Sequence, residues 1–306
     1  MTPHTYTFPY SNRARLKGGL DRWVSRWRRG GVEPLSLIAE REAEGRLLRA
    51  WGHQSGIEVS EHRIRLAGLP EPLRSLRVVQ LTDIHHGLYL PLQAVMDAVE
   101  LANRLAPDVA VLTGDFITYS RAYIQPVAEQ LSQLRARLGI YAVLGNHDFR
   151  VSADAITRAL RRHGIHVLRN QHTLVRQNGD AFYMAGVDDL HYGADLGRAL
   201  HHVPQGAATV LLSHHPGIIR QAARAGVGLV LSGHTHGGQV RLPAVGNGRA
   251  ETQPRRRFQA GLDALGGTQI YVSRGIGTVV VPVRYRCSPE IPLFHLEPYL
   301  HATDLS

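Results

Sequence analysis

The chain has 306 residues, of which 43% are hydrophobic and 20% charged, as in an ordinary globular protein. Its formal net charge of +10 is carried almost wholly by arginine and favours anionic partners such as phosphoesters, nucleic acid or acidic lipid. Cys287 is the only cysteine, which excludes an internal disulfide and a cysteine-based zinc site. No apolar run reaches the roughly 18–20 residues of a membrane-spanning helix, and the N-terminus lacks the apolar core of a secretory signal, so we expect a cytoplasmic protein.

Residues 1–55 form a basic segment without a strand pattern. Leu16, Leu20, Trp23 and Trp27 recur in it at helical spacing, and they are flanked by Arg15, Lys17, Arg22, Arg26 and Arg29. An apolar stripe with tryptophan and flanking arginine is typical of a helix that lies in a membrane interface. The alternative is a helix that packs on the rest of the chain, and Gly18–Gly19 weaken either version.

From residue 76 onward, apolar runs typical of strands alternate with amphipathic runs typical of helices. Strands are expected at Arg77–Leu81, Val109–Leu112, Ile140–Leu144, Thr173–Arg176, Phe182–Ala185, Thr209–Leu212, Leu229–Leu231, Gln269–Ser273 and Pro292–Leu296. Helices are expected at Leu92–Leu105, Ile124–Leu138 and Ala153–His163. The alternation predicts βαβ units and a largely buried sheet. The polar, glycine-rich stretch Pro243–Gly267 predicts a long loop that contains the solvated run Arg255–Arg257.

Five short polar motifs each follow an apolar strand directly. They are Thr82-Asp83-Ile84-His85, Gly114-Asp115, Gly145-Asn146-His147-Asp148, His214-His215-Pro216 and Gly233-His234-Thr235-His236. Polar side chains at the carboxyl ends of adjacent strands converge on one crevice. Imidazole and carboxylate together suit manganese, iron, zinc and related divalent ions. The motifs therefore predict a metal site at one edge of the sheet.

The spacing within the motifs allows two metal ions. Asp83 and His85 alternate along an extended segment, so both can point at one ion, and His234 and His236 do the same. Asp115 lies between these groups in the chain and can bridge two ions with its two oxygens. Two ions about 3.5–4 Å apart can clamp a phosphoryl group and activate a hydroxide. Each motif alone is more often structural, but all five in order after buried strands favour the metal site.

The order DxH, GD, GNHD, H and GHTH resembles the calcineurin-like metallophosphoesterases over roughly Leu76 to Leu296. The strings TDIHHG, LTGDF, LGNHD, GHTHGGQ and RGIGT, with PEI near the end, resemble one bacterial branch of phosphodiesterases associated with the cell envelope. The resemblance implies an α/β (α+β) fold, a four-layer αββα sandwich with two mixed sheets. We expect this catalytic domain over residues 56–298, after the basic segment and before a short tail, 299–306.

The resemblance also implies a ligand set. One metal would be held by Asp83, His85, Asp115 and His236, and the other by Asp115, Asn146, His214 and His234. His214 is preferred to His215 because Pro216 completes the family's H-x-P pattern. His147 would donate a proton or stabilise the phosphate, and Asp148 would orient it. The two ions could be Mn²⁺, Fe²⁺, Zn²⁺ or Mg²⁺, because this ligand set accepts all four.

Other polar residues are weaker candidates. Arg274 and Arg284 could contact phosphate, because an arginine fork suits phosphate oxygens, or they could be surface or structural charges. His86 could reach substrate or lie on the cleft rim. Asp188–Asp189 could shape the cleft, and Cys287 is expected to be inert.

The function that follows is hydrolysis of a phosphoester, in which a metal-bound hydroxide attacks phosphorus and His147 assists the leaving group. A phosphodiester is preferred. It could be lipid-linked or nucleotide-linked, and the N-terminal segment could lie on the anionic inner face of the membrane. One alternative is a pyrophosphatase that acts on a UDP-linked diacylglucosamine in lipid A synthesis. A nuclease is a second alternative, although the chain has no nucleic-acid recognition motif. A non-catalytic metal-binding scaffold is a third, although every expected ligand is present.

Overall fold

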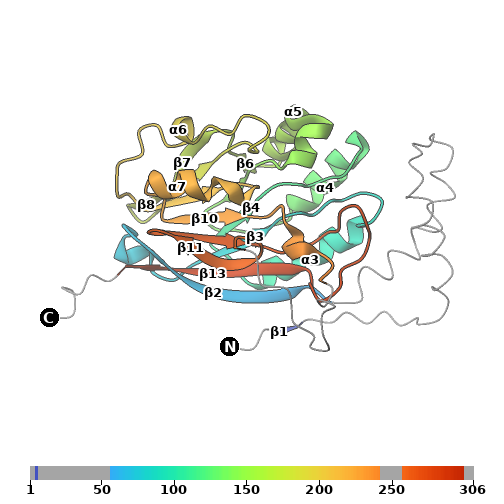
Figure 1. Cartoon of the computed structure of the whole chain (residues 1–306), viewed down its shortest axis with the longest axis horizontal. Coiled ribbons are helices and arrows are strands. Elements are labelled where there is room, and N and C mark those ends of the chain that lie inside the picture. Colours follow the sequence, from blue (N-terminus) through green and yellow to red (C-terminus); the bar gives the residue numbers. More distant parts are fainter. Residues whose placement is uncertain (1–3, 6–55, 242–256, 300–306) are drawn as a thin grey trace, which may run out of the picture.

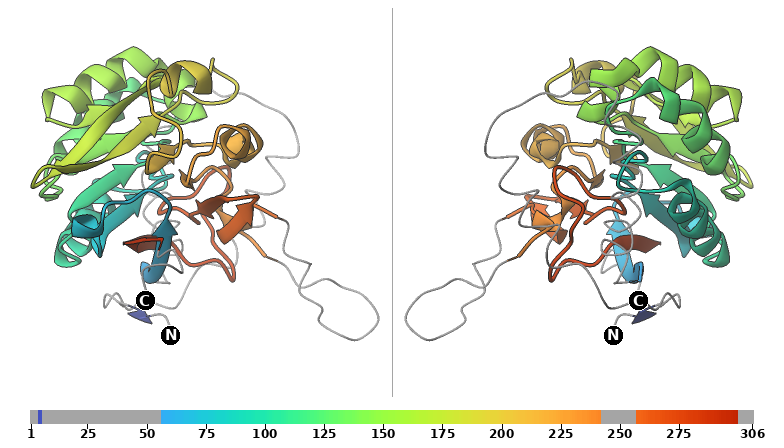
Figure 2. Two further views of the ribbon diagram at one scale, coloured as in Figure 1. Left: turned by 90° about the vertical axis from the view of Figure 1, so that its left-hand side faces the viewer. Right: turned by 90° about the vertical axis from the view of Figure 1, so that its right-hand side faces the viewer.

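The computed structural model describes residues 4–5, 56–241 and 257–299, in which two mixed β-sheets pack face to face with helices on their outer sides (Figures 1 and 2). The amphipathic helix expected around residues 16–27 and the arginine run at residues 255–256 lie outside the described residues. The tail expected at residues 299–306 lies outside them as well, except for Tyr299.

The first sheet has the strand order β1-β2-β13-β3-β4-β5-β6. Its strands are β1 (His4–Thr5), β2 (Glu58–Leu66), β3 (Leu76–Leu81), β4 (Val109–Leu112), β5 (Ile140–Ala142), β6 (His166–Val167) and β13 (Glu290–Pro298). Strands β3 to β6 run parallel, while β13 is antiparallel to β3 and parallel to β2. The parallel block therefore ends at one edge of the sheet, where three of the five motifs follow its strands.

The second sheet has the order β11-β12-β10-β9-β8-β7. Its strands are β7 (Gln171–Gln177), β8 (Asp180–Gly186), β9 (Thr209–Leu212), β10 (Leu229–Ser232), β11 (Gly261–Leu265) and β12 (Thr268–Val272). Strands β8, β9, β10 and β12 run parallel, and an antiparallel hairpin strand closes each side. The other two motifs follow β9 and β10.

Three hydrophobic clusters explain the layers. One cluster packs the outer face of the first sheet against three helices, α3 (Leu92–Arg104), α4 (Ile124–Leu131) and α5 (Asn146–Arg162). A second fills the space between the sheets and includes Val111 of β4 and Leu231 of β10. A third packs the outer face of the second sheet against α6 (Leu196–Ala199) and α7 (Ile219–Arg224). The layers are thus helix, sheet, sheet and helix, which confirms the predicted αββα sandwich.

Strands whose apolar runs are continuous were the easiest to predict. Val109–Leu112 and Thr209–Leu212 have the predicted bounds, and both are buried along their whole length. β2 was not predicted, because its alternation shows clearly only at Ile64 and Leu66. The two-residue strand β1, which pairs with β2, lies in a segment for which no strand was expected.

Two predicted elements differ in extent. Helix α4 ends at Leu131 rather than at residue 138. Its continuation is diverted because the Asn103 side chain donates to the carbonyl of Gln133 and accepts from the backbone N–H of Arg135. The loop predicted up to Gly267 was wrong for residues 261–265, which form β11 and pair with β12.

Candidate metal centre

The five motifs meet at one edge of the sandwich. Asp83 follows β3 and is tied to the end of β4, because its backbone N–H donates to the carbonyl of Gly114 at 3.0 Å. The backbone N–H of His234, which follows β10 in the other sheet, donates to both carboxylate oxygens of Asp83 at 3.0 Å. The carboxyl ends of both sheets are therefore joined through Asp83, and polar groups from both converge there.

The first cluster consists of Asp83, His85, Asp115 and His236. The Nε2 atoms of His85 and His236 lie 3.1 Å apart, and Nε2 of His236 is 3.4 Å from Oδ1 of Asp83. Oδ2 of Asp115 is 3.5 Å from Nε2 of His85. The ligand atoms of Asp83, His85 and His236 all lie within 4.8 Å of one another and are buried. This spacing would allow them to bind a single cation.

The second cluster shares Asp115 and adds Asn146, His214 and His234. Oδ2 of Asp115 is 3.2 Å from Nε2 of His214, whose Nδ1–H donates to the carbonyl of Thr113. Nδ1 of His234 lies 3.1 Å from Oδ1 of Asn146 and 3.3 Å from Nε2 of His214. The predicted ligands thus form two groups with Asp115 between them.

The charges at this edge suit a cation. Burial lowers the pKa of His85 and of His236, which keeps both imidazoles neutral with a free lone pair. Burial also acts on His214, but the Asp115 carboxylate beside it raises its pKa to about 10. Asp115 therefore favours a positive charge on His214, and binding of a metal ion by these two residues would release that proton.

The backbone at the motifs is strained. Asp83, His85, Asp115, His234 and His236 all have positive φ angles, between 50° and 71°, a region that non-glycine residues rarely adopt. Such strain costs on the order of 1–3 kcal/mol per residue and persists only where the surrounding structure imposes it. Its concentration at five predicted ligands favours a functional role for this edge.

The first turn of α5 brings His147 and Asp148 to the same edge. The His147 ring lies edge-on to the His85 ring at 4.8 Å, and its backbone N–H donates to Oδ1 of Asp115 at 2.8 Å. Asp148 is buried, and its carboxylate accepts from the backbone N–H groups of Gly145, Asp115 and Phe116. Among the described residues its hydrogen bonds go to these amides rather than to the His147 imidazole. Burial and the charge of Asp115 raise the pKa of Asp148 to about 8.

Comparison with known proteins gives the family. Residues 76–238 match the calcineurin-like phosphoesterase family model. The chain is 34% identical over 247 residues to an uncharacterized metallophosphoesterase, YkuE, of Bacillus subtilis, covering 79% of this chain and 86% of the relative. The chain belongs to the calcineurin-like metallophosphoesterases. It is also 31% identical over 241 residues to the phosphodiesterase YaeI of Escherichia coli, covering 76% of this chain and 87% of that relative.

Membership of this family makes the chain a metal-dependent phosphoester hydrolase. The bacterial origin of these two relatives agrees with the bacterial branch that the motifs resemble. A zebrafish (Danio rerio) protein named as a transmembrane protein with a metallophosphoesterase domain is 33% identical over 249 residues, covering 76% of this chain and 56% of the relative. Within residues 56–241 and 257–299 of the metallophosphoesterase, no helix is long and apolar enough to cross a membrane.

The candidate substrate contacts of the metallophosphoesterase are engaged with protein groups. Arg274 forms ion pairs with Glu58 at 3.0 Å and Glu290 at 3.1 Å. His86 is buried, and its Nδ1 hydrogen-bonds with the carbonyl of Leu90 at 2.9 Å. These partners favour the structural alternative for Arg274, and they place His86 against the backbone rather than on an exposed rim of the cleft.

Arg284 has a different set of partners. Its guanidinium donates to the carbonyls of Arg274, Gly275 and Gly277, and Nη2 lies 3.5 Å from Nδ1 of His236. Arg284 therefore contacts the first cluster directly at His236 and otherwise binds the backbone of the loop at residues 274–277.

Two supporting features were missed in the sequence. The Thr118 hydroxyl hydrogen-bonds with Nδ1 of His85 at 2.9 Å, which leaves Nε2 directed at the cluster. The loop at Gly275–Gly277 donates backbone N–H groups to the carbonyls of Thr82 and Asp83. Thr118 lies two residues after the LTGDF string, and nothing in the sequence marks it as a partner of His85. The loop coincides with the RGIGT string, which was a signal for its importance.

Proposed function

We propose that this metallophosphoesterase is a phosphodiesterase that binds two divalent metal ions through the seven side chains of the two clusters. The observation that carries the proposal is the position of Asp115, whose Oδ2 lies 3.5 Å from Nε2 of His85 and 3.2 Å from Nε2 of His214. One buried carboxylate between the imidazoles of the two clusters is the arrangement that a shared bridging ligand requires. The donor set of imidazole, carboxylate and amide oxygen suits Mn²⁺, Fe²⁺, Zn²⁺ or Mg²⁺.

The two ions would neutralise charge on the phosphoryl oxygens and lower the pKa of the attacking water. The residues of the chain would place the substrate and move protons. His147 lies beside His85 at the edge of the clusters and is half-buried, so its imidazole would hydrogen-bond a phosphoryl oxygen or protonate the leaving oxygen. Asp148 would tie the start of α5 to the loop after β4, because its carboxylate accepts from the backbone N–H groups of Gly145, Asp115 and Phe116. Preference for a diester is supported by the name of the Escherichia coli relative.

The test is hydrolysis of bis-p-nitrophenyl phosphate and of p-nitrophenyl phosphate by the metal-stripped full chain, with and without added Mn²⁺. We expect Mn²⁺ to restore cleavage, with the diester cleaved faster. Asp115→Ala should remove the restored activity, whereas Glu129→Ala, an exposed carboxylate of α4, should keep it. Faster cleavage of the monoester would contradict the diester preference. Full activity in Asp115→Ala would contradict the bridging role.

A second candidate substrate is a lipid-linked nucleoside pyrophosphate, of the UDP-diacylglucosamine type. It is favoured by exposed apolar side chains beside the clusters. Tyr119 is 74% exposed, and its ring lies 6.4 Å from that of His147. Val240, which follows His236 by four residues, is also exposed and pairs through a β-bridge with the exposed Tyr285. Release of UMP from UDP-diacylglucosamine, in the absence of diesterase activity on the nitrophenyl ester, would select this substrate, and cleavage of DNA or RNA would instead select a nuclease.

A membrane surface is the partner proposed for the N-terminal segment. Residues 1–55 contain ten basic and five acidic residues, so they carry half of the net charge. Basic segments are attracted to anionic lipid by about 1 kcal/mol for each charge near the surface. Deleting Met1–Gly52 should therefore weaken sedimentation with anionic vesicles and leave binding to neutral vesicles unchanged. Equal binding of both forms to anionic vesicles would contradict the proposal.

A further inference from the structure

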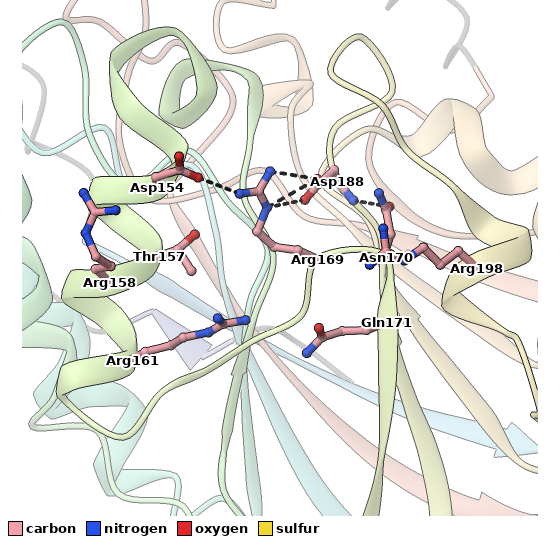
Figure 3. Close-up of a pocket in the computed structure, with 9 residues that line it drawn as sticks. All are labelled: Asp154, Thr157, Arg158, Arg161, Arg169, Asn170, Gln171, Asp188 and Arg198. Atoms are coloured by element: carbon pink, nitrogen blue, oxygen red, sulfur yellow. Dashed lines mark hydrogen bonds and ion pairs between the residues drawn. The ribbon is translucent and has the colours of Figure 1, made fainter.

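A second polar pocket lies between α5 and β7, with one wall contributed by α6 (Figure 3). Its cavity is about 430 Å³, and none of its lining residues belongs to the two ligand clusters. Pockets of roughly 300–1,000 Å³ are the size that small-molecule ligands occupy. The lining contains four arginines, Arg158, Arg161, Arg169 and Arg198, and two aspartates, Asp154 and Asp188.

The two aspartates are already paired. Arg169 binds Asp188 through Nε and Nη2 at 3.0 Å each, and Asp154 through Nη1 at 3.0 Å. These bonds raise the pKa of Arg169, Asp188 being the principal cause. The positive charge of the other three arginines is therefore left without a carboxylate among the residues that line the pocket.

Most N–H groups of those three arginines make no hydrogen bond within the described part of the chain. In the described part of the chain, the guanidinium groups of Arg158 and Arg198 have neither a hydrogen bond nor an ion pair, and Arg161 donates only to the carbonyl of Val167. Arg158 and Arg161 are three residues apart on α5 and so share one face of the helix, while Arg198 comes from α6. Figure 3 shows Arg161 reaching from α5 towards Gln171 of β7.

A further polar group of the lining is unsatisfied. The hydroxyl of Thr157, a residue that is 7% exposed, has no hydrogen-bond partner among the described residues. A buried polar group without a partner costs about 1–3 kcal/mol. The hydroxyl oxygen of Thr157 is closed to solvent, so only the three guanidinium groups face a ligand, and they are chemically matched by an anion that carries several oxygens.

We propose that this pocket binds a small ligand with a diphosphate group, at a site separate from the metal clusters. Arginine forks match phosphate oxygens in geometry and charge. Cations on two walls of the cavity favour two linked phosphates over one. The absence of a described aromatic side chain from the lining favours a small ligand over a nucleic acid strand, whose bases stack on aromatic rings. The diphosphate could be inorganic pyrophosphate or part of a nucleoside diphosphate.

The test is calorimetric titration of the metal-stripped full chain with inorganic pyrophosphate and, separately, with ADP. We expect one saturable site. The double variant Arg158→Gln/Arg198→Gln should bind at least about 10-fold more weakly, because each arginine supplies a charge-assisted bond to phosphate. The control is Arg162→Gln, which removes one arginine charge from an exposed position of α5 outside the pocket. It should change the affinity less than about 2-fold, since a charge that does not contact the bound anion is largely screened.

The titration can overturn the proposal in three ways. Unchanged affinity in the double variant would place the anion elsewhere, including at the metal clusters. An equal loss in Arg162→Gln would mean attraction by net charge alone. A single-stranded oligonucleotide that binds more tightly than either diphosphate, and loses affinity in the double variant, would make the pocket part of a nucleic-acid surface. Tighter binding of ADP than of pyrophosphate would identify a nucleoside diphosphate, and equal binding would identify the inorganic ion.

Discussion

Gly233 allows Asp83 and the second sheet to approach closely. A Cβ atom at this position would lie 2.2 Å from Oδ2 of Asp83 and 2.2 Å from the hydroxyl of Thr82. Gly233→Ala should therefore displace the Asp83 carboxylate from the first cluster. We expect bound Mn²⁺ and diesterase activity to fall together, by about 10–100-fold, the range seen when groups that orient metal ligands are changed. Metal content and initial rates would measure both.

Gly267→Ala is the matched control, because an added Cβ there meets nothing within 4 Å and no positive φ is involved. It should keep both metal and activity. Retention of full metal affinity by Gly233→Ala would show that Asp83 is not a ligand.

Thr118 fixes the orientation of a second ligand. Its hydroxyl bonds with Nδ1 of His85 at 2.9 Å, and both side chains are buried. Thr118→Val keeps the shape but removes the bond, so the imidazole loses the partner that fixes its tautomer. We expect metal affinity to fall about 10-fold, as is usual for a lost partner of a metal-bound histidine. Thr173→Val on β7 is the control, and an unchanged metal dissociation constant in Thr118→Val would contradict the role.

At the scale of single residues, the sequence predicted which polar groups gather at the edge. Every predicted ligand lies in one of the two clusters, because each follows a buried parallel strand. The partners of the arginines could not be predicted, since Glu58 and Glu290, which bind Arg274, lie far from it in sequence. Nor did the sequence reveal that His86 would turn to the carbonyl of Leu90.

At the scale of elements, Arg284 secures the loop that follows β12. Its guanidinium donates to the carbonyls of Arg274, Gly275 and Gly277, while the loop in turn donates to the backbone of Thr82 and Asp83. Lysine cannot reproduce this fork. Arg284→Lys should lower the free energy of unfolding by about 1–3 kcal/mol through unsatisfied buried carbonyls. It should also weaken metal binding, with kcat falling more than KM rises.

Denaturant unfolding and steady-state kinetics would measure these effects, with Arg286→Lys, an exposed neighbour, as the control. If Arg284→Lys keeps its stability and its bound metal and only KM rises, Arg284 contacts the substrate instead.

The elements themselves were predictable to the extent that their patterns are local. Helix α3 has buried residues three and four positions apart and ends one residue before its predicted end. Helix α5 was predicted only from Ala153, because the GNHD motif obscures its first turn and Ser152 is non-helical. The first turn, with His147, is capped by the hydrogen bond from the Gly145 N–H to the Asp148 carboxylate. Helices α6 and α7 are too short to give a clear period.

At the scale of the whole molecule, the two ligand clusters connect the two sheets. Asp83, His85, Asp115 and Asn146 come from the first sheet, while His214, His234 and His236 come from the second. Bound metals would therefore act as a crosslink between the halves of the sandwich. Without them, Nε2 of His85 and Nε2 of His236, 3.1 Å apart, have only a hydrogen bond to each other in place of a shared cation. The stability of the molecule should depend on metal for this reason.

Metal removal should lower the melting temperature. A ligand present at about 100 times its dissociation constant stabilises the folded state by about 2.7 kcal/mol. For a chain of this size each kcal/mol shifts the melting temperature by about 2–4 °C. We therefore expect chelation to lower it by roughly 5–10 °C, and added Mn²⁺ to restore it. Scanning fluorimetry with and without EDTA would measure the shift.

The Asp115→Ala variant distinguishes two causes of a lower melting temperature, loss of a metal crosslink and a general effect of EDTA. Without the shared carboxylate, both clusters lose a ligand, so Mn²⁺ should raise the melting temperature of this variant little or not at all. Glu129→Ala should respond as the wild type does, because its carboxylate lies on the outer surface of α4. A Mn²⁺-dependent shift of full size in Asp115→Ala would mean that the stabilising ion binds elsewhere. The absence of any shift in the wild type would mean that the clusters add no crosslink between the sheets.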